Sequence, residues 1–182
     1  MKVEFKPYGK TKRYSSGENR ITITEKINGT NGCIVIDKDL NITVGSRERI
    51  ITPEKDNYGF AGWVEKNKEE IVKLGPGVYY GEWWGTKIQG NPNNAEEKHF
   101  SIFNTYIPSD TLPDCIKQVP ILYEGAYSDE IVKKVFNDLW NTQSTLGGEP
   151  EGIVIDFHMA RAKRKMTYKN SRGKWLTDNN KG

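Results

Sequence analysis

Lys26 ends a stretch of alternating apolar and polar residues, and Gly29 follows it within the same short segment. A lysine at the end of a strand is held on a rigid edge, and a glycine-bearing turn lets the backbone approach a ligand closely. Once it has lost its proton, such a lysine is a nucleophile that can form a covalent intermediate. The alternative is a hairpin turn with an exposed lysine, because Asn28-Gly29 is a common hairpin dipeptide.

Two glutamates in apolar surroundings are the second chemical feature of the sequence. Glu82 lies inside the aromatic segment 78–85 and, by alternation, on the same face as Tyr80 and Trp84. Glu151 opens an apolar strand next to a glycine. Because an unpaired buried carboxylate is costly, each glutamate needs sugar hydroxyls or a nearby cation as partner. The alternative for each is a salt-bridged or edge-exposed glutamate.

The order of these residues along the chain carries more information than any one of them. The order is Lys26, Arg47, Glu82, Phe103, Glu151, Lys165. With its local contexts it resembles the covalent nucleotidyltransferase superfamily, which contains ATP-dependent RNA ligases, DNA ligases and messenger-RNA capping enzymes. The resemblance covers nearly the whole chain, from Glu25 to about Lys169.

The resemblance implies a role for each residue around the nucleophile. Lys26, in a lysine-x-x-glycine motif, would attack the α-phosphorus of ATP and form a lysyl–AMP phosphoramidate. Glu25 would lie close to the adenine or to the lysine, and Asn31 would belong to the nucleotide-binding set. Arg47 would contact phosphate or ribose, and Glu82 would bind the ribose.

The resemblance also implies a base-stacking residue, a metal ligand and a phosphate-neutralising lysine. Phe103 would stack on the adenine, with Phe100 or a plain core role as the competing interpretations. Glu151 would hold a divalent metal, Mg²⁺ or Mn²⁺. Lys165 would neutralise the α-phosphate as charge builds. Positioning and electrostatic stabilisation supply most of the catalysis in phosphoryl transfer, so this set of residues suits the reaction.

Two positions depart from the DNA-ligase pattern. Asn28 stands where DNA ligases and many relatives carry aspartate, and Asn31 stands where DNA ligases usually have arginine. RNA ligases are looser at the first position, and asparagine at the second favours their branch. We therefore expect an ATP-dependent RNA ligase that joins a 5′-phosphate to a 3′-hydroxyl. The alternatives are a DNA ligase or capping-type nucleotidyltransferase, and a non-catalytic nucleic-acid-binding relative.

The last motif of the superfamily usually has two lysines separated by one residue, and three alignments fit this chain. Lys165 can take the first position, which leaves Thr167 in the second. A shifted alignment pairs Thr167 with Lys169, and a third pairs Lys163 with Lys165. Lys165 and Lys169 both stay in the predicted nucleotide-binding set.

These side chains need strands and helices to hold them in place. Helical periodicity predicts an amphipathic helix over 58–74 and a second helix that opens at Ser128. The pattern favours an α+β fold. The resemblance implies an ATP-grasp-like ligase adenylation domain, built of antiparallel sheets with a few flanking helices. Strands are predicted over 20–26, 33–37, 41–44, 78–84, 99–106, 121–124, 151–157 and 164–169.

Length and composition are those of one folded domain. The chain has 182 residues, 35% of them hydrophobic, and shows neither an internal repeat nor a low-complexity linker. We expect a single nucleotidyltransferase domain over residues 1–182. Few residues follow Lys169, so no C-terminal barrel or helical domain is expected. RNA binding would then come from the domain itself or from a protein partner that supplies specificity.

The net charge of +3 is too small to identify a polyanionic partner, but the basic residues gather near the two ends. Such clusters can track the phosphates of RNA without reading its sequence. Equally, they are a common form of solvated surface. The residues concerned are Lys10, Lys12, Arg13, Arg161, Lys163, Arg164, Lys165, Lys169, Arg172 and Lys174.

The two cysteines, Cys33 and Cys115, lie far apart in the sequence and have no neighbours at metal-ligand spacing. We expect reduced thiols, as in cytosolic proteins. No apolar run approaches the roughly 20 residues of a membrane span, and the polar N-terminus does not look like a secretory signal. We therefore expect a cytoplasmic protein, from a bacterium or a phage-infected cell, with no membrane partner.

Overall fold

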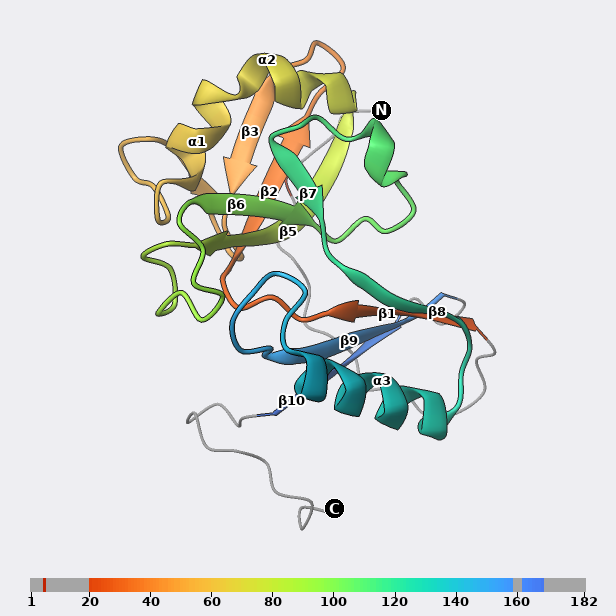
Figure 1. Cartoon of the computed structure of the whole chain (residues 1–182). Helices are drawn as coiled ribbons and strands as arrows, with labels where there is room; N and C mark the ends of the chain where they lie inside the picture. Colours follow the sequence, from red (N-terminus) through yellow and green to blue (C-terminus); the bar gives the residue numbers. More distant parts are fainter. Residues whose placement is uncertain (1–4, 6–19, 159–161, 169–182) are drawn as a thin grey trace. The chain divides into compact units, whose positions relative to one another are not determined.

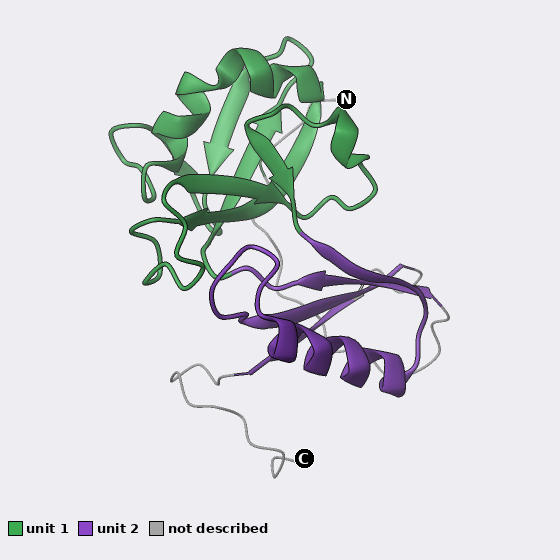
Figure 2. Ribbon diagram, in the orientation of Figure 1, with its two compact units in different colours: residues 1–9, 28–119 green, residues 10–27, 120–182 purple. Residues whose placement is uncertain are grey.

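The computed structural model describes residues 5, 20–158 and 162–168, and the chain divides into two compact units (Figure 2). Unit 1 contains residues 1–9 and 28–119, and unit 2 contains residues 10–27 and 120–182. The chain therefore passes from unit 2 into unit 1 after Ile27 and returns after Val119. The expectation of a single domain over residues 1–182 stays a prediction.

Unit 1 is built on a six-stranded sheet with the strand order β4-β3-β2-β5-β6-β7. Neighbouring strands are antiparallel, except for β6 and β7, which pair in parallel. The short strands β4 and β7 were not expected from the sequence. The strands are β2 (Thr30–Ile36), β3 (Ile42–Gly45), β4 (Ile50–Ile51), β5 (Gly77–Gly85), β6 (Lys98–Ile102) and β7 (Ile116–Gln118).

Helices cover one face of this sheet (Figure 1). They are α1 (Phe60–Lys66), α2 (Lys68–Ile71) and the short 3-10 helix η1 (Val72–Leu74), and a further 3-10 turn, η2, spans Ser109–Thr111. Apolar side chains of the sheet pack against α1 and α2 in one core, so alternate residues of β2, β5 and β6 face the helices. The remaining residues of these strands face the other side of the sheet, where Asn31 and Glu82 lie in register.

The single helix predicted over 58–74 is wrong in two respects. It starts later, at Phe60, because Tyr58 and Gly59 have left-handed backbone angles, with φ of 53° and 81°. It is also interrupted at Asn67, whose side-chain amide donates to the Trp63 carbonyl at 2.8 Å. Asparagine competes in this way for backbone hydrogen bonds and so interrupts helices.

The strand predicted over 99–106 is shorter than expected, because β6 ends at Ile102. The chain turns immediately afterwards, and the Thr105 amide bonds the Phe103 carbonyl at 3.0 Å. Phe103 therefore lies just beyond the strand and not within it.

Unit 2 is a four-stranded antiparallel sheet with the order β10-β9-β1-β8, and one face of it is covered by α3 (Figure 1). The predicted start of α3 is confirmed, since the Ser128 hydroxyl accepts from the Ile131 amide at 3.1 Å. Ile21, Ile23 and Ile155 pack with α3 in a second core. The elements are β1 (Arg20–Glu25), β8 (Ile121–Ala126), α3 (Asp129–Thr142), β9 (Gly152–Phe157) and β10 (Ala162–Thr167).

The two sheets and their helices agree with the expected α+β class and its antiparallel sheets. Cys33 and Cys115 are both free thiols, and burial raises the pKa of Cys33 to about 12. Within the described part of the chain, no helix has both the length and the apolar character that a membrane crossing requires.

Candidate active site

Lys26 lies at the end of β1 in unit 2, beside the start of β9. Its backbone amide donates to the Gly152 carbonyl at 2.9 Å, which continues the β1–β9 pairing by one residue. Its ammonium nitrogen Nζ contacts the Glu151 carboxylate oxygen Oε1 directly. The strand register therefore unites two predicted site residues that are far apart in the sequence.

The Lys26–Glu151 pair is neither fully buried nor fully exposed, with side-chain exposures of 20% and 29%. A pair in this range keeps contact with solvent and is accessible to a ligand. The contact places the Glu151 carboxylate against the Lys26 nitrogen, so a phosphate has to approach that nitrogen from its solvent-exposed side or displace the carboxylate.

The backbone conformation at position 152 explains why a glycine follows Glu151. Its φ is +150°, a backbone conformation that side chains rarely adopt. A Cβ built on Gly152 would lie 1.9 Å from the Met166 carbonyl oxygen on β10. The glycine therefore lets β9 and β10 pair closely at the point where Glu151 meets Lys26.

Glu25 is almost completely buried, at 2% exposure, and its carboxylate is bonded to the segment that follows α3. Oε2 accepts from the Thr145 amide at 3.0 Å and from the Thr145 hydroxyl at 2.6 Å, while Oε1 accepts from the Ser144 hydroxyl. The side chain thus anchors a loop of unit 2. Sequence reasoning missed Ser144 and Thr145, and no local pattern in the sequence links them to Glu25.

Strand β10 carries the lysines of the last motif. Lys163 pairs with Asp156 in the β9–β10 ladder, and its Nζ lies 3.0 Å from the Asp156 carboxylate. Lys165 pairs with Val154, and Thr167 pairs with Gly152, next to the Lys26 backbone. By alternation, these β10 residues share one face of the sheet. Lys163 is engaged in an ion pair, and Lys165 lies one step nearer to the Lys26 end.

Several predicted residues lie outside the described part of the chain, so the structure does not place them. They are Lys169 of the nucleotide-binding set and the basic residues Lys10, Lys12, Arg13, Arg161, Arg172 and Lys174.

In unit 1, a hydrogen-bonded row joins three of the predicted nucleotide-binding residues. The Arg47 guanidinium Nε donates to Asn31 Oδ1 at 3.0 Å, and Asn31 Nδ2 donates to Glu82 Oε2 at 3.2 Å. Asn31 and Glu82 are direct partners in the β2–β5 ladder. The amide of Asn31 therefore links a cation and an anion without carrying charge itself.

Gly29, the glycine of the lysine-x-x-glycine motif, belongs to unit 1 and lies against β5. A Cβ at this position would lie 2.5 Å from the Trp83 carbonyl oxygen and 2.9 Å from the Trp84 Cβ. No side chain fits there, so the motif's glycine is required by close packing of the chain on the strand that carries Glu82.

The two phenylalanines that compete for the base-stacking role have different environments. Phe100 is completely buried and packs on Phe60 with ring centroids 4.9 Å apart. It is a core residue of unit 1. Phe103 is half-buried just after β6, and its amide donates to the Tyr80 carbonyl at 2.8 Å. Of the two, Phe103 is the one that is not fully buried.

Beside Glu82, a second polar group occupies the same face of the unit 1 sheet. The Trp84 indole donates to the Ser101 hydroxyl at 3.0 Å, and its ring lies 4.8 Å from the His99 ring. Lys117 Nζ lies 5.9 Å from the Trp84 ring centroid. Burial and the nearby Lys117 charge lower the pKa of His99.

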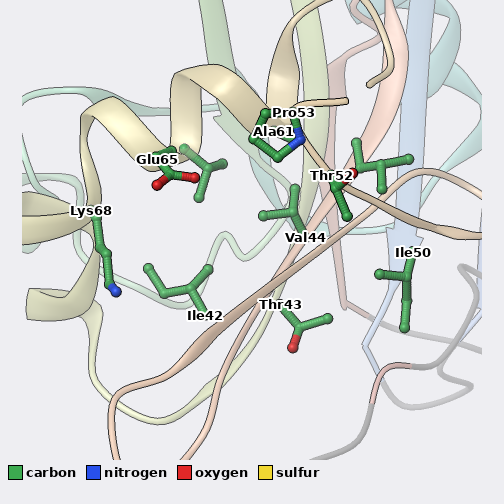
Figure 3. Close-up of a pocket in the computed structure, with 11 residues that line it drawn as sticks. Ile42, Thr43, Val44, Ile50, Thr52, Pro53, Ala61, Glu65 and Lys68 are labelled. Carbon is green, nitrogen blue, oxygen red and sulfur yellow. The ribbon is translucent and has the colours of Figure 1, made fainter. Parts of the chain in front are cut away.

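A pocket of about 340 Å³ also lies in unit 1, between β3, β4 and α1 (Figure 3). Its lining is about equally polar and apolar, and Glu65 and Lys68 contribute charged groups to it. None of the predicted site residues lines it. The predicted set instead divides into the Lys26 group of unit 2 and the Arg47–Asn31–Glu82 row of unit 1.

Comparison with known proteins identifies the chain's relatives. The model of the RNA ligase family matches residues 19–175. Among curated proteins no match was found.

Solved structures of a Naegleria gruberi RNA ligase share the fold. A variant solved with ATP and manganese has a TM-score of 0.60 at 17% identity, over 82% of this chain and 50% of that one. An apo variant has a TM-score of 0.62 at 19% identity, over 82% and 49% of the two chains. Another variant with ATP and manganese has a TM-score of 0.62 at 15% identity, over 91% and 60%. The chain thus spans about half the length of these ligases, and its family match covers most of its own length: it belongs to the RNA ligase family.

Proposed function

We propose that the chain is an ATP-dependent RNA ligase that works through a covalent lysyl–AMP on Lys26. The observation that carries the proposal is the contact between Lys26 and Glu151 at the β1–β9 edge. The Naegleria ligase variants solved with ATP and manganese support ATP as the nucleotide substrate and a divalent metal as the cofactor.

The proposed reaction has three steps. The neutral Lys26 amine forms a bond to the α-phosphorus of ATP, the bond to the bridging oxygen breaks, and pyrophosphate leaves with the electron pair. The nitrogen loses a proton to solvent, which gives the phosphoramidate. An oxygen of the RNA 5′-phosphate then attacks the same phosphorus, and the lysine amine leaves and takes up a proton. Finally, the 3′-hydroxyl oxygen attacks the 5′-phosphorus, loses its proton, and AMP leaves.

The residues present fit a divalent metal held mainly by substrate. Within the described residues, no three His, Cys, Asp or Glu side chains converge on a metal position. Glu151 therefore offers one carboxylate, and phosphate oxygens and water would complete the shell, as is common for Mg²⁺. A cation held there would supply positive charge beside the α-phosphate and draw Glu151 away from Lys26.

The other residues of the set bind and orient the nucleotide in this proposal. Arg47 contacts phosphate or ribose, Glu82 binds the ribose, and Asn31 fixes the distance between them through its two hydrogen bonds. Phe103 stacks on the adenine. Lys165 neutralises the α-phosphate in the transition state.

The proposed polynucleotide substrate is RNA. The partner would be an RNA with a 5′-phosphate and a 3′-hydroxyl end. Arg164 on β10 is exposed and can contribute positive charge for phosphates. We also propose that the chain acts in the cytoplasm, and that a protein partner can add RNA specificity.

The test is incubation of the purified chain with Mg²⁺ or Mn²⁺ and α-labelled ATP, followed by denaturing electrophoresis. We expect an acid-labile labelled band for the wild-type chain and no band for Lys26→Ala. Lys134→Ala is the matched control, because this exposed α3 lysine of the same unit forms a surface ion pair with Asp138. Labelling of Lys26→Ala equal to that of the control would refute the assignment of Lys26 as the nucleophile.

A second arm separates the ligase from its relatives. Labelling by ATP but not by GTP distinguishes the proposed enzyme from a capping-type nucleotidyltransferase. Sealing of RNA but not DNA ends distinguishes it from a DNA ligase. A folded chain that binds RNA but is labelled by neither nucleotide would be a non-catalytic relative.

A further inference from the structure

Tyr58, just before α1 in unit 1, combines an exposed ring with a strained backbone. Its φ is 53°, and 48% of the residue is exposed to solvent. Left-handed backbone angles are unfavourable for a large aromatic residue and persist only where surrounding contacts impose them. Because the Tyr58 side chain is exposed, its burial does not offset the free-energy cost of this backbone strain.

The backbone of Tyr58 is held by donors from two strands of the sheet. Its carbonyl oxygen accepts from the Trp83 indole Nε1 at 3.2 Å and from the Lys98 ammonium at 2.6 Å. On the preceding residue, the Asn57 side chain donates to the Thr30 hydroxyl at 3.0 Å. The conformation is thus fixed by contacts to β2, β5 and β6.

Asp56, two residues before Tyr58, fixes the backbone that follows Tyr58. Its carboxylate accepts from the Ala61 amide at 2.8 Å and from the Gly62 amide at 3.0 Å, in the first turn of α1. The backbone on both sides of Tyr58 is therefore pinned while its ring is left accessible to solvent.

Leu40 serves as a comparison, because it is an exposed residue with a left-handed backbone in an ordinary turn. It has a similar φ of 63° and a similar exposure of 45%. It lies in the tight turn between β2 and β3, where its amide donates to the Asp37 carbonyl at 3.1 Å. The turn explains the left-handed backbone of Leu40, whereas the left-handed backbone of Tyr58 is held by contacts to three strands.

We propose that Tyr58 is a stacking residue for an unpaired base of the RNA substrate. Aromatic rings that are exposed and held rigid stack on bases of any sequence. Its anchors Thr30 and Trp83 are partners at one end of the β2–β5 ladder, next to the Asn31–Glu82 pair along the strands but on the helix-covered face of the sheet. Lys98 adds positive charge beside the Tyr58 backbone, which favours a phosphate chain over an uncharged partner. The inference rests on the proposed function, which supplies RNA as the ligand.

The experiment measures binding of a fluorescent single-stranded RNA with a 5′-phosphate to the full chain. We expect Tyr58→Gly to weaken binding about tenfold, a typical contribution of one base–aromatic stack. The melting temperature of this variant stays the same or rises, because glycine adopts the left-handed conformation freely. Tyr58→Phe keeps the ring and binds within about twofold of the wild type.

Leu40→Gly is the matched control, since it relieves the same kind of backbone conformation at a different exposed site. It is expected to bind RNA as the wild-type chain does. Should Tyr58→Gly unfold, Tyr58→Asn is the second variant, because asparagine also tolerates this conformation.

Three results would overturn the inference. One is a Tyr58→Gly variant that is folded and binds RNA like Leu40→Gly. Another is an equal loss for Tyr58→Phe, which would assign the effect to the hydroxyl. A third is a loss for Leu40→Gly as large as that for Tyr58→Gly, which would assign the effect to the relieved backbone conformation and not to the ring. ATP labelling of the wild-type chain scores the proposed function separately, so either proposal can fail while the other stands.

Discussion

Asn31 contacts both charged residues of the unit 1 row, accepting from Arg47 and donating to Glu82. An amide side chain can do both at once, whereas a carboxylate can only accept. In Asn31→Asp the donor is lost and a second carboxylate faces Glu82. Because a hydrogen bond to a charged group contributes about 1.5–3 kcal/mol, we expect the ATP concentration for half-maximal labelling to rise about tenfold or more. Asn141→Asp, on the exposed surface of α3, should leave it unchanged.

Glu25 is a second residue whose role follows from its contacts, because its carboxylate accepts hydrogen bonds from donors of the 144–145 segment. In Glu25→Gln the new amide group would face donors instead of accepting from them. We expect a loss of about 1–3 kcal/mol in the free energy of unfolding, measured by urea denaturation. If Glu25→Gln is as stable as the wild type but fails to react with ATP, Glu25 acts on the nucleotide and not on the loop.

Strand β10 carries both lysines that compete for the last motif, and their surroundings differ. Lys163 is paired with Asp156, while Lys165 lies nearer to the end of the sheet that carries Lys26. We expect Lys165→Met to reduce the rate of lysyl–AMP formation by about 10²-fold, the scale of losing one preorganised transition-state contact. Lys163→Met should reduce it by less than about threefold, a bound set by the small contribution of a partly exposed ion pair. The reverse order would assign the motif to Lys163.

Strand β6 introduces a pH dependence of stability through His99. Burial and the Lys117 charge hold its pKa below the ordinary value of 6.5, so the folded chain binds the proton less readily than the unfolded chain. Stability should therefore fall as pH drops below 6.5, where the unfolded state takes up the extra proton. Thermal melting between pH 7.5 and pH 5 should show a flatter decline for His99→Gln. An unchanged slope would exclude His99 as the source.

At the scale of the whole molecule, the sequence predicted the positions of single strands and helices better than the pairing between strands. Alternation located most of β1, β5 and β9, and Ser128 marked the start of α3. The break at Asn67 depends on a side chain that bonds one turn back, and the three-residue β7 is defined by its parallel pairing with β6.

The candidate site shows the same limit. Lys26 and Glu151 could each be named from their neighbours, but their contact is set by the β1–β9 register. Glu25 was expected near the nucleotide or the lysine. Its bonds to Ser144 and Thr145 could not be read from the sequence, because they join segments more than a hundred residues apart.

The division into two units leads to a prediction about cooperativity. The core that contains Ile34 is formed by residues of unit 1 alone, and the core that contains Ile155 by residues of unit 2 alone. Truncating a fully buried isoleucine to alanine costs about 2–5 kcal/mol. We expect Ile155→Ala to speed amide exchange in β1, β9 and α3 while β2 and β5 keep their protection, and Ile34→Ala to do the converse. Hydrogen exchange followed by mass spectrometry makes the measurement. Equal acceleration in both units would show that residues 1–182 open as one cooperative domain, because local loss of packing would then be shared by both cores.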